Sequence, residues 1–327
     1  MAKRTITHSA MQSFKDCRAK YNYRYLQRLV PVEKREALYF GSAVHAGLEA
    51  WFRYGIAEQA IDLAYSFDEI GLENQCKAAE LLRAYIEHWH TEPFEVISIE
   101  RIFEAPLINP ATKYPSTYWT LSGKVDGLVR YENSFYILEH KTTSSIDDAY
   151  LGRILIDAQI AIYALALSRE LGGPVVGAIY DILQKPSIRM KKGESEEEFE
   201  ARRAALIAKS KTGKSSAKQQ IAETEAEFRE RLKESITADN FRREIVKFQP
   251  EQLVQMEAEL WELAADMRTV KTYYKNTSSC TKYGSPCEYL PLCRCNGDLA
   301  LCEGLYTSQE AHSELKCESK QQEELPW

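Results

Sequence analysis

The sequence lacks a long run of uncharged apolar residues. No stretch of its 327 residues approaches the roughly 18 apolar residues that span a bilayer, and the first residues, MAKRTITHSAMQSF, lack the apolar segment of a secretory signal. An excess of positive charge is also missing, since the formal net charge is −6. This charge argues against a protein that coats nucleic acid, although a local basic groove is compatible with it. We therefore expect a cytoplasmic protein without a membrane partner.

Paired C-x-x-C motifs, which are typical of zinc ribbons, are absent as well. In a reducing compartment, clustered cysteines favour metal ligation over disulfides. Five of the eight cysteines fall within 23 residues, namely Cys280, Cys287, Cys293, Cys295 and Cys302. The first three leave a tetrahedral site one ligand short, and Cys295 is one candidate for the fourth ligand, which would give a local zinc site.

Two kinds of hydrophobic spacing are present, and they predict the fold class. Apolar residues recur every three to four positions in the first ninety residues and alternate with polar ones in several later segments. Helices are expected over residues 9–29, 42–55, 57–90 and 157–171, strands over 94–103, 118–131, 135–142 and 174–186, and a strand and helix over about 243–270. The pattern indicates an α/β fold: a mixed central sheet flanked by helices, with a helical N-terminal part.

The chain is expected to form a single domain over residues 1–300. Residues 190 to about 236 are rich in both charges and poor in large apolar side chains, which predicts an exposed helical insertion. A cysteine region follows at 280–295. Residues 303–327 are polar, so we expect a disordered tail there.

The segment YILEHKT, residues 136–142, carries two charged side chains at the end of an apolar strand. Glu139 and Lys141 are two positions apart and therefore point to one face of the strand. If residues 132–133 form a two-residue turn, Asp126 lies opposite Glu139, whereas a shift by one pair sets it opposite Lys141. Two carboxylates suit Mg²⁺, and a lysine beside them suits a developing phosphate charge. An ion pair at a strand end is the structural alternative.

Four short motifs, GSAVH, GKVDG, LEHKT and QIAIY, occur in this order along the chain. Together with the cysteines they resemble the PD-(D/E)XK nuclease superfamily, specifically its RecB-like branch, which includes CRISPR-associated and phage exonucleases. The resemblance extends from residue 5 to about 295. It implies a restriction-endonuclease-like core that hydrolyses phosphodiester bonds in DNA with Mg²⁺ or Mn²⁺, as an exonuclease.

The resemblance assigns roles to individual residues of this chain. It implies that His45, Asp126, Glu139 and the backbone carbonyl of His140 bind the metal, and that Lys141 is the catalytic lysine. Gln159 and Tyr163 match the family's Q-x-x-x-Y motif and would face DNA. From the residues alone, His45 could equally be a core histidine, and the Gln159–Tyr163 pair a surface feature beside an apolar stripe.

Iron–sulfur members of this branch suggest a different fourth cysteine. The resemblance implies a [4Fe–4S] cluster on Cys17, Cys280, Cys287 and Cys293, which would close a very long loop, with structural Zn²⁺ as the alternative.

The segment around Cys17 mixes basic and aromatic residues. It predicts contacts with DNA, single-stranded or at ends, from Arg18, Lys20, Tyr21 and Arg24. The chain ends EELPW, an acidic tip that resembles the end of bacterial single-stranded-DNA-binding proteins. A recombination or replication protein is therefore a possible partner, in a bacterial or phage-infected cell. A non-cleaving DNA-binding scaffold and a CRISPR spacer-acquisition nuclease remain alternatives.

Overall fold

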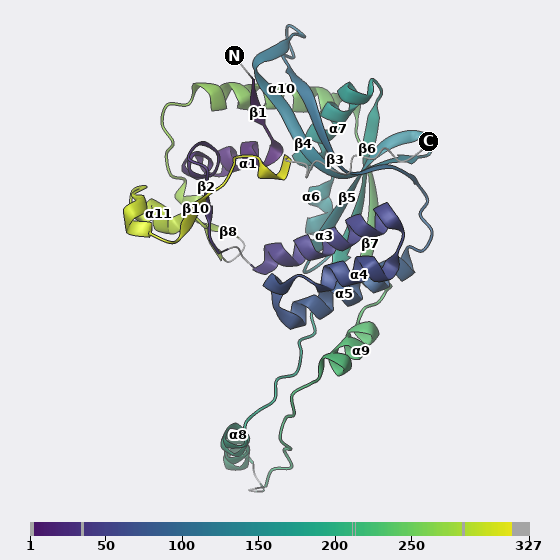
Figure 1. Cartoon of the computed structure of the whole chain (residues 1–327), viewed down its shortest axis with the longest axis vertical. Coiled ribbons are helices and arrows are strands. Elements are labelled where there is room, and N and C mark those ends of the chain that lie inside the picture. Colours follow the sequence, from purple (N-terminus) through teal and green to yellow (C-terminus); the bar gives the residue numbers. More distant parts are fainter. Residues whose placement is uncertain (1–2, 34–35, 211, 213, 283–284, 316–327) are drawn as a thin grey trace.

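A six-stranded mixed sheet forms the centre of the computed structural model, which describes the chain except residues 1–2, 34–35, 211, 213, 283–284 and 316–327 (Figure 1). The strands are β1 (Arg4–Ile6), β3 (Glu95–Ile108), β4 (Pro115–Tyr131), β5 (Ser134–Thr143), β6 (Val175–Gln184) and β7 (Phe241–Lys247). Their order is β1-β4-β5-β6-β7, with β3 paired to β4. The β1–β4 and β5–β6 pairs are parallel and the others antiparallel, which confirms the predicted mixed sheet.

Helices cover both faces of the sheet. One face is covered by α3 (Glu36–Tyr54) and α5 (Gly71–His88), with α4 (Ala57–Tyr65) packed on these two helices, and the other by α1 (His8–Asp16), α7 (Ala158–Leu171) and α10 (Pro250–Thr269). Neighbouring β6 residues show the division, because Ile182 belongs to the α7 core and Leu183 to the α3 core, each fully buried.

The most apolar helical stretch, Asp148–Leu171, is long and apolar enough to cross a membrane by composition alone. In the fold it is divided into α6 (Asp148–Ile154) and α7. Side chains of α7 such as Ile160 and Leu167 are buried against the sheet. This burial is what a core helix of a globular domain shows.

The turn between β4 and β5 sets the register that the sequence left open. Glu132 and Asn133 both have positive φ angles, 47° and 61°, as a two-residue hairpin turn requires. Tyr131 pairs with Ser134, and the ladder continues to Gly127 opposite Leu138. The next position outward sets Asp126 beside Glu139, so the first of the two predicted registers is confirmed.

Three predicted helices differ from the observed ones, and the helix expected over 57–90 is divided at Ser66 and Phe67 into α4 and α5. Helix α3 begins at Glu36 rather than near Ser42, so His45 lies in the interior of the helix and not in its first turn. The N-terminal helix is interrupted at Cys17, whose backbone is extended, and continues as α2 (Arg18–Tyr21) and the π-helical turn η1 (Asn22–Leu26). Its cap is Thr7, not a serine, because the Thr7 hydroxyl accepts from the Ala10 amide.

The charged insertion contains α8 (Glu196–Lys209) and α9 (Glu225–Ser235). Figure 1 shows α8 far from the sheet, at the end of two extended limbs. The limbs lie side by side, because the Glu194 amide donates to Gln220 O at 3.0 Å and the Glu223 amide to Lys191 O at 3.1 Å. Helix α9 returns to the body and packs on α5.

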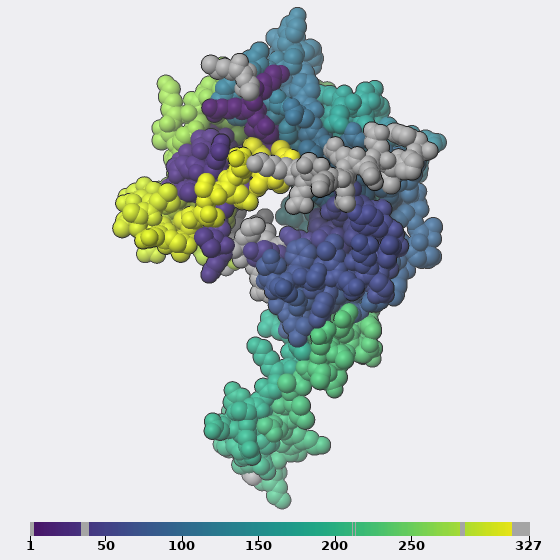
Figure 2. All heavy atoms as spheres, viewed as in Figure 1, coloured from purple at the N-terminus to yellow at the C-terminus, as the bar shows by residue number. Residues whose placement is uncertain are grey.

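Residues 303–315 do not behave as the expected disordered tail. Strand β10 (Tyr306–Ser308) pairs antiparallel with β2 (Leu29–Pro31) near the start of the chain. Figure 2 shows these C-terminal residues, in yellow, lying across the purple N-terminal segment. The EELPW end lies outside the described residues.

Candidate active site

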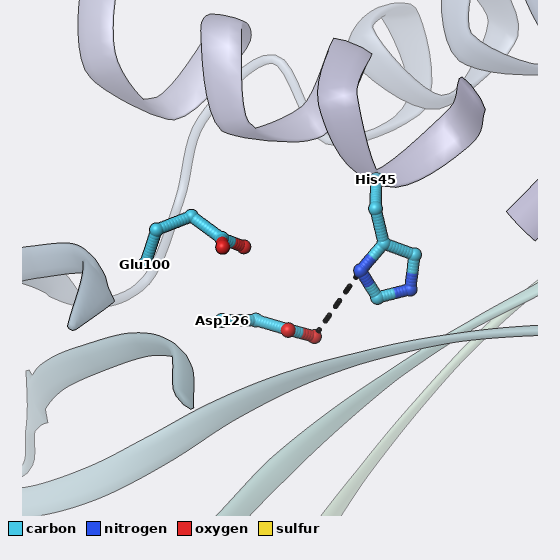
Figure 3. Close-up of side chains that lie close together, drawn as sticks. All are labelled: His45, Glu100 and Asp126. Atoms are coloured by element: carbon cyan, nitrogen blue, oxygen red, sulfur yellow. Dashed lines mark ion pairs between the residues drawn. The ribbon is translucent and has the colours of Figure 1, made fainter. Parts of the chain in front are cut away.

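Three side chains from three elements converge on one point between α3 and the sheet. His45 comes from α3, Glu100 from β3 and Asp126 from β4. Their ligand atoms lie within 4.8 Å of one another, and His45 Nδ1 is 3.6 Å from Asp126 Oδ2 (Figure 3). A nitrogen and two carboxylate groups at this spacing can hold a divalent cation.

Glu100 was not predicted from the sequence. It lies opposite Asp126, since the neighbouring pairs are Ile99 with Gly127 and Arg101 with Val125. Its φ angle is 52°, an unusual value for a residue other than glycine, and its carboxylate pairs with Lys124. The available signal was the adjacent charged pair Glu100–Arg101, which breaks the alternation in the apolar strand.

Burial and neighbouring charge shift the pKa values of these groups in opposite directions. Burial opposes ionisation of Asp126, but the hydrogen bond and charge of His45 outweigh it and lower the Asp126 pKa to about 2. Burial, followed by the charge of Asp126, raises the pKa of Glu139 to about 7. The site therefore concentrates carboxylates that repel one another, and a bound cation would relieve this repulsion.

Lys141 connects the carboxylates to helix α7. Its ammonium pairs with the Glu139 carboxylate and donates to Gln159 Oε1 at 3.3 Å. Burial works against the charged form, but Glu139 outweighs it and the Lys141 pKa is raised. This pairing favours the positively charged form of Lys141 beside the carboxylates. Gln159 itself follows the cap Asp157, which accepts from the Gln159 amide.

Tyr163 supports Gln159 from inside the core. Gln159 Nε2 donates to the Tyr163 hydroxyl at 3.4 Å, and the ring packs edge-on against Phe103 with centroids 5.1 Å apart. Tyr163 is 6% exposed. The expected contact of Tyr163 with DNA is therefore not available, because the side chain is enclosed by the sheet; its contact with the site runs through Gln159.

His140 joins the two halves of the site through its backbone. Its amide donates to Asp126 Oδ2 at 2.8 Å. Its side chain is 4% exposed and faces the α3 layer, where the ring stacks on Phe52 and Nδ1 lies 3.6 Å from Asp181. Asp181 in turn pairs with Arg243 at 2.9 Å. The metal contact of the His140 carbonyl stays a prediction.

The predicted site residues His45, Asp126, Glu139, Lys141 and Gln159 thus come together, and residues 5–294 match the family model of the PD-(D/E)XK nuclease superfamily. The chain belongs to this superfamily. Membership implies a phosphodiester hydrolase that acts on DNA with divalent metal ions. No curated protein matches this nuclease.

Among solved structures, the nuclease is similar to one described as "Crystal structure of SSO0001". The identity is 12%, the TM-score is 0.28, and the match covers 83% of this chain and 89% of that one. At this TM-score the likeness adds nothing to the argument.

The nuclease also has a cysteine module, formed by Cys17 and the segment from Cys280 to Cys302. Cys17 packs with Tyr289 and Leu292, and against Cys287 and Cys293. The Asn276 amide donates to Cys17 Sγ at 3.3 Å, and both Asn276 Nδ2 and the Ser279 hydroxyl donate to Asp16 O at 2.8 Å. These bonds hold the backbone open at Cys17, which explains the interrupted helix.

The thiols divide into two sets. Burial, then the Cys17 thiol, raises the pKa of Cys293, and burial raises that of Cys287. Cys295 instead hydrogen-bonds Cys302, whose pKa is raised first by burial and then by this bond. The raised pKa values of Cys287 and Cys293 disfavour their thiolate forms unless a metal ion compensates the charge. Cys280 lies on the same segment, where its carbonyl accepts from the Cys287 amide.

The predicted DNA contacts near Cys17 differ in accessibility. Tyr21 is 5% exposed and stacks on Tyr25, so the expected contact of Tyr21 with DNA does not fit the fold. Arg18 lies between the rings of Phe14 and Tyr274, at 4.9 Å from each centroid. Lys20 and Arg24 are partly exposed.

Proposed function

We propose that the protein is a Mg²⁺- or Mn²⁺-dependent deoxyribonuclease that acts as an exonuclease on DNA ends. The observation that carries this proposal is the convergence of His45, Glu100 and Asp126 beside Lys141. Oxygen-rich sites with few protein ligands suit ions that also bind substrate phosphates. Placement of the enzyme in recombination, repair or phage DNA processing, in the cytoplasm of a bacterial or phage-infected cell, rests on the family resemblance alone.

His45, Asp126, Glu139 and the His140 carbonyl would hold the cation, and Glu100 is an additional candidate. A bound divalent ion supplies Lewis-acid activation of water and neutralises negative charge on the phosphate. Because Lys141 is charged, it would donate to a phosphate oxygen and stabilise the pentavalent transition state. Gln159 fixes the position of the Lys141 ammonium, and Tyr163 fixes Gln159.

The cysteine module fits a metal group, and we propose a [4Fe–4S] cluster on Cys17, Cys280, Cys287 and Cys293. Cys17, Cys287 and Cys293 pack in one cluster at the break in the N-terminal helix, and the Cys280 carbonyl accepts from the Cys287 amide. Structural Zn²⁺ on the same residues is the alternative. Because Cys295 pairs with Cys302, a local zinc site that uses Cys295 has less support.

The first test is cleavage of end-labelled single-stranded and double-stranded DNA with Mn²⁺, after anaerobic purification. Shortening by the wild type and not by Asp126→Ala supports the metal site, and the product ladder gives polarity and strand preference. Lys141→Ala is expected to abolish cleavage while DNA binding persists, since the lysine acts on the transition state. Wild-type cleavage by that variant would exclude the role of Lys141. Binding without cleavage by any form would favour a scaffold.

A further inference from the structure

A groove with a volume of about 440 Å³ leads away from Gln159 along the N-terminal helices. Its lining comes from α1, α2 and η1 on one side and from Gln159 and Glu288 on the other. Gln159 contacts the Lys141 ammonium, so the inner end of the groove meets the candidate catalytic lysine. The volume falls within the range of about 300–1,000 Å³ that is common for ligand sites.

One row of side chains runs the length of the groove at a spacing of four residues. The row consists of His8, Gln12, Asp16, Lys20 and Arg24. The spacing places them on one face, and the break at Cys17 does not interrupt the row. Polar groups occupy the inner half, and the two cations occupy the outer half.

The inner half of the groove offers neutral hydrogen-bonding groups. Burial lowers the pKa of His8 to about 4, so its imidazole is uncharged near neutral pH. Ser13, which is 6% exposed, also lines the groove, and no hydrogen-bond partner for its hydroxyl is present within the described part of the chain. Neutral donors and acceptors suit base edges, which are available for contact when a strand is unpaired.

In the outer half, the Lys20 and Arg24 side chains can exchange their protein partners for a phosphate at a small cost in free energy. Lys20 pairs with Glu288 at 3.0 Å, but the two side chains are 31% and 34% exposed. Solvent-exposed pairs of this kind contribute about 0–1 kcal/mol, so a phosphate can replace the carboxylate. Arg24 donates to the Glu310 backbone carbonyl at 3.3 Å, and this bond does not neutralise the Arg24 charge.

We propose that this groove binds one unpaired DNA strand as it continues from the scissile phosphate, with Gln12 facing the bases and Lys20 and Arg24 facing two phosphates. The inference rests on the proposed nuclease function. The strand is single because, among the described residues, Lys20 and Arg24 are the cations that line the groove, and Asp16 and Glu288 lie beside them. A duplex would bring more phosphates than this groove can neutralise. Tyr25 forms part of the wall, not a stacking surface, because Tyr21 and His312 cover its ring.

The binding test uses the full-length protein, without divalent metal, and a fluorescent single strand over a series of salt concentrations. Each phosphate contact on a single strand contributes about −0.7 to the slope of log K against log salt. Lys20→Ala and Arg24→Ala are each expected to reduce the slope by about 0.7. Lys15→Ala is the matched control, because Lys15 is exposed on α1 outside the groove. Equal effects of Lys15→Ala and Lys20→Ala would overturn the proposal, as would equal affinity for a blunt duplex.

The cleavage test separates the groove from the metal site. Gln12→Trp fills the groove, so we expect about a tenfold lower kcat/KM on a long single strand. Hydrolysis of bis(p-nitrophenyl) phosphate needs only the metal site, so its rate should fall less in this variant than the rate of strand cleavage. Lys15→Trp should change neither reaction. Strand cleavage by Gln12→Trp at the rate of the unmodified protein would refute the groove. If the unmodified protein cleaves neither substrate, the nuclease function is refuted, and the binding test alone decides whether the groove binds DNA.

Discussion

Replacement of Gly123 by alanine should damage the site without touching any charged residue. A Cβ at this position would lie 2.6 Å from the Phe103 ring and 2.9 Å from the Tyr163 ring. Restoring an ordinary contact of 3.4 Å requires shifts of about 0.8 Å and 0.5 Å. Both rings are buried, so the strain is not relieved by movement into solvent. Overpacking of this kind costs about 1–3 kcal/mol of stability.

The same shift should lower activity through a chain of two hydrogen bonds. Tyr163 accepts from Gln159 at 3.4 Å, close to the limit for a hydrogen bond, so a displacement of the ring breaks this contact. Gln159 then no longer fixes the Lys141 ammonium, which it meets at 3.3 Å. Misplacement of a catalytic group by about 1 Å can cost about 100-fold in rate. We expect a reduction of kcat between about 10-fold and 100-fold.

The assay pairs urea unfolding with the rate of cleavage of a labelled strand. Gly152→Ala is the matched control, since Gly152 lies in α6 and a Cβ there meets nothing within 4 Å. This variant should be about 0.5–1 kcal/mol more stable, because alanine favours a helix more than glycine does, and its cleavage rate should not change. Phe103→Leu in the Gly123→Ala background should recover part of the loss by opening space. A Gly123→Ala variant with wild-type stability and rate would refute the reasoning.

Three further predictions concern other parts of the molecule. Asp181→Ala should cost about 3–5 kcal/mol in urea unfolding, because it leaves Arg243 as a buried cation with one carboxylate fewer; a loss near zero would contradict this. Cys17→Ser should lose bound iron and sulfide, or zinc, whereas Cys295→Ser should retain them, and elemental analysis of both variants decides. Glu100→Gln should raise the Mn²⁺ concentration for half-maximal cleavage about 10-fold or more; an unchanged value would remove Glu100 from the ligand set.

The sequence sufficed where local chemistry decides the structure. Glu132 and Asn133, both at positive φ, form the two-residue β4–β5 turn, and the turn sets the pairing that brings Asp126 to Glu139. The helical spacing of α7 likewise placed Gln159 and Tyr163 on one face. Such features depend on residues that are near each other in the chain.

The errors occur where distant segments decide the structure. The break at Cys17 depends on hydrogen bonds from Asn276 and Ser279, which the spacing of apolar residues in the N-terminal segment cannot indicate. Residues 303–315 are polar, but β10 is ordered by pairing with β2, which lies far earlier in the chain. Glu100 was missed because its left-handed backbone breaks the strand pattern on which the prediction relied.

The cysteine module joins segments near the two ends of the described chain, so it can form only late in the synthesis of the protein. Cys17 leaves the ribosome 263 residues before Cys280, a delay of about 13–53 s at 5–20 residues per second. During that interval the C-terminal residues that contact Lys20 and Arg24, namely Glu288 and Glu310, have not yet been made. The catalytic residues between 45 and 163 are made during this interval, but the groove proposed for the DNA strand is completed only when the C-terminal segment with Glu288 is made. A nascent chain is therefore expected to acquire its metal ligands before it can hold a DNA strand.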